Sequence, residues 1–258
     1  MHRLGQIGPL AVQRPFFPEG RQVCHVVLLH PPGGIVPGDS LDVELDVQSG
    51  AHALVTTPAA TKVYRSDGRP ARQTQTLKAL AGATLEWLPQ ETILFDGARA
   101  YLDTRVDLCG DARFIGWDVL CLGRPAAGET AFSGSCRQRL ELFLDGRPLL
   151  SERSNYGREL QSAPWGMRNA SVVATLFVTS LTLAGETLQE LLGRLRVLAA
   201  SASIDGAWRS VSVVGGVLVL RYLGDSAERA RTFCESAWRQ VRPVLLGRPA
   251  CLPRIWLT

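Results

Sequence analysis

The chain has 258 residues, 46% of them hydrophobic, and a formal net charge of +4. This length and apolar content can build a sizeable core, which excludes a disordered chain. The longest apolar run, residues 211–220, is far shorter than the roughly 20 residues of a spanning helix, so we expect no transmembrane helix. The first 20 residues lack the continuous apolar core of a secretory signal, which favours a cytoplasmic protein.

The basic charge comes almost entirely from arginine, because Lys62 and Lys78 are the only lysines of the sequence. The arginines are spread singly with acidic residues between them, whereas a nucleic-acid binder usually concentrates its charge on one face. This pattern suits protein interfaces and carboxylate pairing better. The six cysteines form no CxxC pair, so we expect reduced, mostly buried thiols.

The first part of the chain, from Val23 to about Leu150, predicts many short strands, because apolar or β-branched runs alternate there with Gly, Pro and Asp. In residues 41–47, LDVELDV, every second residue is apolar, which predicts a strand with one solvated face. Residues 24–30 and 117–122 are apolar on both sides and predict strands buried between layers. Turns are expected at three Asp-Gly pairs: Asp67-Gly68, Asp96-Gly97 and Asp145-Gly146.

Two later segments predict helices. Leucines recur at helical spacing in residues 186–201, which is typical of an amphipathic helix. A second helix is expected over residues 225–242, starting with a capping pair of Asp225 and Glu228 and ending before Pro243. No linker or repeat divides the sequence. We therefore expect a mainly β protein, one domain over residues 1–258, with strands in stacked sheets and two late helices.

Residues 28–39, LLHPPGGIVPGD, are the segment that most resembles a functional loop. Its glycines are not followed by the lysine and helix of a phosphate-binding loop, and no G-x-S-x-G motif occurs in the chain. No local motif therefore predicts nucleotide binding or nucleophilic catalysis. A hydrolase using His30 and Asp39 remains an alternative hypothesis.

Local motifs do not predict a tight metal site either. His25 and His30 point to opposite faces of one predicted strand, and Cys24 and His30 share a face but lie roughly 20 Å apart. A loose passage lined by carboxylates is compatible with the sequence, although for each candidate taken alone the sequence favours an ordinary solvated or salt-bridged turn residue. The candidates for such a passage or for a partner surface are His30, Asp39, Glu86, Glu91, Asp96 and Asp118.

Six ordered blocks of the chain closely resemble the UreD family of urease accessory proteins, also called UreH. Only residues from about 171 to 216 match in general character alone. The blocks are QRPFFPEG at 13–20, CHVVLLHPPGGIVPGD at 24–39, GAHALVTTPAATKVYRS at 50–66, LEWLPQETILFDGA at 85–98, ARFIGWDVLCLGRPAAGE at 112–129 and GRPAxxPRIW at 247–256.

The resemblance implies a β-rich fold with two helices and a non-enzymatic role. It implies that the chain acts with UreF and the GTPase UreG to deliver nickel into apo-urease, while UreE supplies the metal. It further implies an internal water-filled passage, with Ni²⁺ in transit and no tightly bound cofactor. Family members usually carry a further strand or hairpin before the segment that begins at residue 13, which leaves two alternatives: the hairpin is absent here and an edge strand is open, or the true start of the protein lies further upstream. A cytoplasmic hydrolase and a generic β-rich adaptor are the alternatives.

Overall fold

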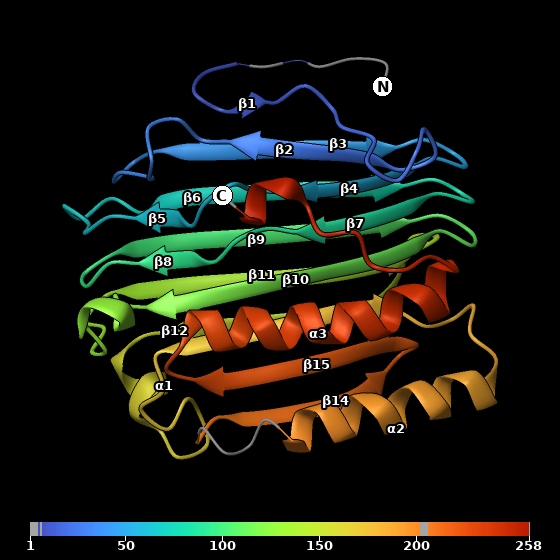
Figure 1. The fold of residues 1–258 in the computed structure, drawn as a ribbon. Helices are drawn as coiled ribbons and strands as arrows, with labels where there is room; N and C mark the ends of the chain where they lie inside the picture. The colour runs from blue at the N-terminus through green and yellow to red at the C-terminus, as the bar shows by residue number, and fades with distance from the viewer. Residues whose placement is uncertain (1–4, 6, 202–205, 258) are drawn as a thin grey trace.

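The computed structural model describes residue 5, residues 7–201 and residues 206–257. Two β-sheets stack face to face, and helices cover the outer face of one of them (Figure 1). The prediction of a mainly β protein with stacked sheets and two late helices is therefore confirmed. Within the described part of the chain, no helix combines the length and the apolar character needed to cross a membrane.

The first sheet has ten strands, joined in the order β1-β2-β4-β7-β10-β13-β15-β14, with β5 and β8 alongside β10. Their bounds are β1 Ala11–Val12, β2 Cys24–Leu29, β4 His52–Thr56, β5 Thr61–Val63, β7 Thr84–Leu88, β8 Thr92–Leu94, β10 Arg113–Leu122, β13 Val172–Thr179, β14 Trp208–Val214 and β15 Val217–Gly224.

The second sheet has five strands in the order β12-β11-β9-β6-β3. Their bounds are β3 Ser40–Val47, β6 Ala71–Ala79, β9 Arg99–Leu108, β11 Ser135–Leu144 and β12 Arg147–Tyr156. The α-helices of the described chain are α1 Arg158–Ser162, α2 Gly185–Ser201 and α3 Ala227–Leu246, and two short 3-10 helices span Pro125–Ala127 and Arg254–Leu257.

The chain coils between the two sheets from β2 to β11, because strands alternate between the first sheet and the second along the sequence. Neighbours within each sheet are parallel in this region. Val26 pairs with Val55, and Val55 pairs with Trp87, so each turn of the coil takes about 30 residues, within the range of solenoid repeats. The sequence contains no internal repeat from which this coil could have been predicted.

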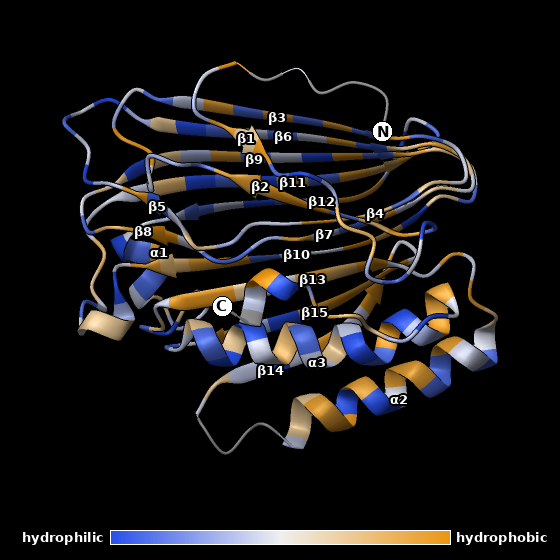
Figure 2. Cartoon of the chain, turned by 45° about the horizontal axis from the view of Figure 1, so that its top comes forward, coloured by the Kyte–Doolittle hydropathy of each residue, from blue (hydrophilic) through white to orange (hydrophobic). Residues whose placement is uncertain are grey.

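The two ends of the coil differ. At one end, residues 48–51, 80–83 and 109–112 form four-residue turns, with a glycine of positive φ at the third position of the first two and at the second position of the last. These turns stack on one another, and the Gly82 amide donates to Asp111 at 2.6 Å (Figure 2). At the other end three of the four connections are longer, at residues 30–39, 64–70 and 123–134, while residues 95–98 form a four-residue turn. Functional residues concentrate on long loops, which directs attention to that end.

Two layers of core follow from the alternation of side chains along the strands. Between the sheets lie residues such as Val55, Leu77 and Phe114. On the outer face of the first sheet, Trp117 packs against Trp238 of α3, with ring centroids 6.4 Å apart. The pattern expected for residues 41–47 is confirmed, since the odd-numbered positions face the core and the acidic ones are exposed.

The ends of α3 differ from the prediction. The helix is capped by Ser226, whose hydroxyl accepts from the Arg229 amide, because Asp225 instead accepts from Ser171. It also continues through Pro243, where the proline removes one backbone donor but burial of the flanking Val241 and Leu245 holds the last turn in place. Helix α1 was not expected from the sequence.

Candidate functional site

A cavity of about 180 Å³ lies between the two sheets at the long-loop end. About 10–15 Å³ of such space suffices for one water, so the cavity can hold several. Its inner walls are the facing surfaces of both sheets, with Trp87 and Phe114 from the first and Leu41 and Val43 from the second. Exposed lining residues at this end are Gly33, in the loop of residues 30–39, and Lys62, in β5, so the cavity opens there.

The first sheet is interrupted beside the cavity. The strand formed by β4 and β5 breaks at residues 57–60, and the strand formed by β7 and β8 breaks at residues 89–91. Pro58 and Pro89 have no amide hydrogen to donate to a ladder, which favours such breaks. The two irregular segments bind each other, because the Gln90 amide donates to the Thr57 hydroxyl at 2.9 Å. Backbone and side-chain oxygens therefore line the cavity where ladder hydrogen bonds would otherwise run.

Asp118 is the carboxylate at the inner wall of the cavity. It belongs to β10, whose even-numbered side chains point between the sheets, and it accepts a hydrogen bond from Gln138 of β11 in the opposite sheet. Burial raises its pKa to about 6, and the bond from Gln138 offsets only part of that rise. Polar groups of the second sheet lie on the facing wall, from Gln73, Gln75 and Thr104.

His30 lies at the mouth of the cavity, directly after β2. Burial lowers its pKa, and the charge of Asp39 partly opposes that shift. The Asp39 carboxylate accepts from the Val36 amide at 3.2 Å and so holds the loop in a turn. Although both residues are described, His30 and Asp39 share no hydrogen bond, so the dyad that a hydrolase would need is not assembled.

The other predicted candidates lie away from this cavity. Asp96 pairs with Arg65 at 2.9 Å and accepts from Ser133, and both partners hold it in a surface loop. Glu91 lies 3.4 Å from Arg231 of α3. Glu86 points to the opposite face of the first sheet, under α3. Of the six candidates, only His30 and Asp118 thus line the cavity.

Glu86 is the centre of a buried ionic network beneath α3. Its carboxylate is fully buried and accepts from the Arg242 Nε atom at 3.0 Å and from the Trp238 indole at 2.6 Å. His52 adds a contact of 2.6 Å. The Arg242 guanidinium then reaches Glu19, with two bonds of 2.8 Å. One buried cation therefore joins two carboxylates from distant parts of the chain.

Glu19 continues the network to His25 and to the C-terminal segment. The Nε2 atom of His25 lies 2.8 Å from Glu19. Burial alone would raise the pKa of Glu19, but the bonds from Arg242 and His25 outweigh that effect and lower it. The ligand atoms of Glu19, His25 and Cys251 all lie within 4.8 Å of one another. This cluster was not predicted from the sequence, because its members come from three segments that no local motif connects.

A signal for the network was present in the sequence. Arg242 lies four residues after Trp238, on the apolar stripe of α3, and Glu86 interrupts the apolar run of β7. A charge on a buried face requires a buried partner, so these two positions could have been paired.

Comparison with known proteins identifies the group to which this fold and sequence belong. Residues 1–257 match the family profile described as "UreD urease accessory protein". The chain belongs to the UreD family. It is 47% identical over 254 residues to a Pseudomonas fluorescens protein named urease accessory protein UreD, covering 98% of this chain and 87% of that protein. It is 44% identical over 255 residues to the UreD of Saccharophagus degradans, covering 97% and 85% respectively.

A third relative extends this range, since UreD 2 of Brucella anthropi is 42% identical over 257 residues and is covered to 92% of its length. The family is named for accessory proteins of urease. All six cysteines are free, and burial raises the pKa of both Cys121 and Cys234 to about 12, which leaves these thiols protonated and unreactive at neutral pH.

Proposed function

We propose that this chain is a scaffold of urease maturation that helps nickel to enter the active site of apo-urease through the cavity between its sheets. It links apo-urease to UreF and, through UreF, to the GTPase UreG, while UreE supplies the metal. The observation that supports this most is the cavity of about 180 Å³ between the two sheets, with the Asp118 carboxylate on its inner wall. Membership of a family named for urease accessory proteins supports the same role.

The chemistry of the cavity suits a metal that must move on. Its polar side chains are the Asp118 carboxylate, the glutamine amides, four threonine hydroxyls, the imidazole of His30 and the ammonium group of Lys62 at the exposed rim, and no cysteine of the described chain is among the lining residues. Oxygen and imidazole ligands bind Ni²⁺ less persistently than a closed cage of thiolates. With a pKa of about 6, Asp118 is mostly ionised at neutral pH and can attract a cation. Binding that is weak and repeated along a path permits passage.

Partner binding is supported by the surface. Apolar side chains are exposed on β14, at the free edge of the first sheet, and on the segment before β2. An unpaired edge with exposed apolar side chains favours association with another protein. These exposed residues are Phe16, Phe17, Trp208, Val213 and Val214.

The test fills the cavity without touching the outer surface. Gln75→Phe places a ring in the cavity, and Thr76→Phe places the same ring on the solvent face of the same strand as a control. Both variants are expressed in a urease-producing host that lacks its own UreD-family gene. We expect both to co-purify with UreF and apo-urease, while Gln75→Phe lowers the nickel content of urease several-fold. Equal nickel content with the two variants would contradict passage through the cavity.

A further inference from the structure

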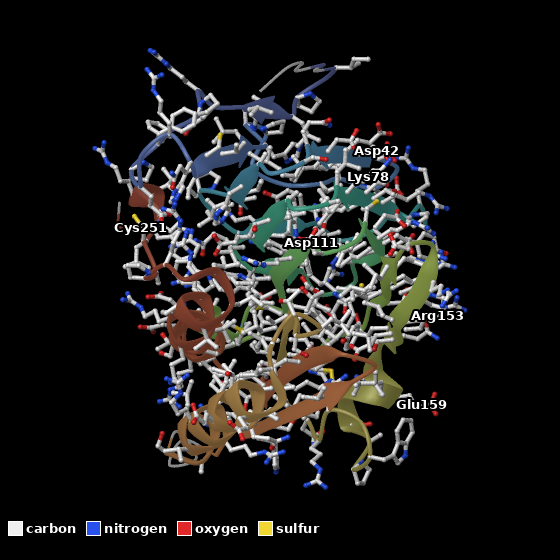
Figure 3. All side chains as sticks on the ribbon, turned by 90° about the vertical axis from the view of Figure 1, so that its right-hand side faces the viewer. Asp42, Lys78, Asp111, Arg153, Glu159 and Cys251 are labelled. Atoms are coloured by element: carbon white, nitrogen blue, oxygen red, sulfur yellow. The ribbon has the colours of Figure 1, made fainter. Side chains whose placement is uncertain are left out.

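A second candidate metal site lies on the outer face of the first sheet, across β2 and β4 from the cavity. It combines Glu19 from the loop before β2, His25 from β2 and Cys251 from the segment after α3. In Figure 3, Cys251 lies at one margin of the molecule, opposite Arg153 of the second sheet. Three chain segments far apart in sequence thus bring a carboxylate, an imidazole and a thiol together.

We propose that Glu19, His25 and Cys251 bind a divalent late first-row cation, such as Zn²⁺, Ni²⁺ or Co²⁺. Sulfur, nitrogen and oxygen ligands together suit this class of metal, whereas Mg²⁺ and Ca²⁺ prefer oxygen alone. This binding is separate from the passage, because His25 and Asp118 point to opposite faces of the first sheet.

The distances require only small movements. The His25 Nε2 atom and the Glu19 Oε1 atom are 2.8 Å apart and share one proton. Two ligands about 2.1 Å from a metal, at right angles, lie roughly 3.0 Å apart, so a cation that replaces this proton widens the gap by only a few tenths of an ångström. Cys251 lies on an irregular, half-buried segment, where its thiol can approach the metal by a rotation of the side chain.

The surroundings already orient the ligands. Arg242 donates to both oxygens of Glu19, and it also donates to the Pro249 carbonyl, two residues before Cys251. Such outer contacts fix ligands in place and strengthen metal binding. Trp238 and His52 complete the support through Glu86.

Charge favours a cation at this position. The two carboxylates of Glu19 and Glu86 share one guanidinium, that of Arg242. A buried uncompensated charge is costly. A cation held by Glu19, His25 and the Cys251 thiolate supplies positive charge at the point where it is missing.

An entry route is present as well. A pocket of about 240 Å³ reaches His25, between Phe16 and Pro18 on one side and Pro253 to Ile255 on the other. Water in this pocket can complete the coordination, because the three protein ligands leave at least one position open.

Titration of the purified full-length chain with Co²⁺ tests the proposal. We expect one equivalent to bind and to produce a thiolate-to-metal charge-transfer band. Cys251→Ala should abolish the band and weaken Co²⁺ and Ni²⁺ binding by at least about tenfold. Cys109→Ala, which removes another half-buried thiol, is the matched control and should change neither.

Absence of binding in the unmodified chain, or a band that persists in Cys251→Ala, would overturn the proposal. A band lost equally in Cys109→Ala would do the same. Because this experiment uses the isolated chain, its outcome is independent of nickel delivery to urease. The cavity variant Gln75→Phe should bind Co²⁺ normally, which separates failure of this site from failure of the passage.

Discussion

Replacing Arg242 by methionine should be among the most damaging single changes in this protein. The guanidinium is fully buried and donates to Glu86, Glu19 and the Pro249 carbonyl. Methionine keeps much of the chain length and the packing but removes the charge. Glu19 and Glu86 would then remain buried with no cation except a protonated histidine.

Removal of one partner from a buried ion pair costs about 3–5 kcal/mol, and we expect a loss of this size in the free energy of unfolding. Urea denaturation followed by circular dichroism measures it. The control is Arg139→Met, because Arg139 is exposed and pairs with Asp103 at 3.0 Å on the surface. An exposed pair contributes about 1 kcal/mol or less.

The pH dependence gives an independent readout. The pKa of Glu19 is lowered in the folded state, so Glu19 contributes stability that is present above its ordinary pKa of 4.5 and is lost as the pH falls through the folded pKa. Arg242 is the main source of this shift. In Arg242→Met the acid-dependent loss of stability should therefore be smaller. The role assigned to Arg242 would be refuted if Arg242→Met lowered the free energy of unfolding by less than about 1 kcal/mol. It would also be refuted if stability fell at low pH as steeply in the variant as in the unmodified chain.

Three further changes should act through single features. The pKa of Asp118 is raised, so the ionisation of this carboxyl costs stability as the pH rises from 3.8 to about 6. Asp118→Asn should therefore increase the free energy of unfolding, measured by urea denaturation, by about 2–3 kcal/mol at pH 7.5 but not at pH 3.5. The same substitution should lower urease activation. Gly123→Ala should lower stability by about 2 kcal/mol or more, because a Cβ would lie 2.4 Å from the Glu129 carbonyl oxygen. The control is Gly128→Ala, which has a similar φ but open space around the Cβ and should cost about 1 kcal/mol. Equal melting temperatures of the two variants would contradict this prediction. Ser226→Ala should cost about 1 kcal/mol by removing the α3 cap, and an unchanged melting temperature would show that the cap contributes nothing.

Local patterns predicted much of the secondary structure because its causes are local. Alternation in residues 41–47 reports one solvated face, and the Asp145-Gly146 pair has the two positive φ angles of a tight hairpin between β11 and β12. The leucine spacing of α2 and the apolar stripe of α3 likewise need no knowledge of distant residues. The cap of α3 was misplaced because Asp225 has a competing partner, Ser171, 54 residues earlier.

The candidate site was only partly predictable, because its members meet through the coil. Asp118 looked like any carboxylate in a strand until the second sheet placed Gln138 opposite it. In the sequence, Glu86 looked equivalent to Asp118. Side chains alternate between the two faces of a strand, however, and the Glu86 side chain lies on the face toward α3, where it binds Arg242, 156 residues later in the sequence. A sequence pattern indicates that a strand is buried on both faces, but not which layer covers each face.

The two ends of the coil have different roles: one end fixes how the strands pair, and the loops at the other end can vary. The tight glycine turns fix the pairing register of both sheets at one end, and the long loops at the other end contribute little to that register. Insertions or deletions in residues 30–39 or 57–60 can therefore reshape the rim of the cavity while every strand keeps its neighbours. Related chains can adjust the entrance to different partner surfaces in this way without redesigning the walls behind it.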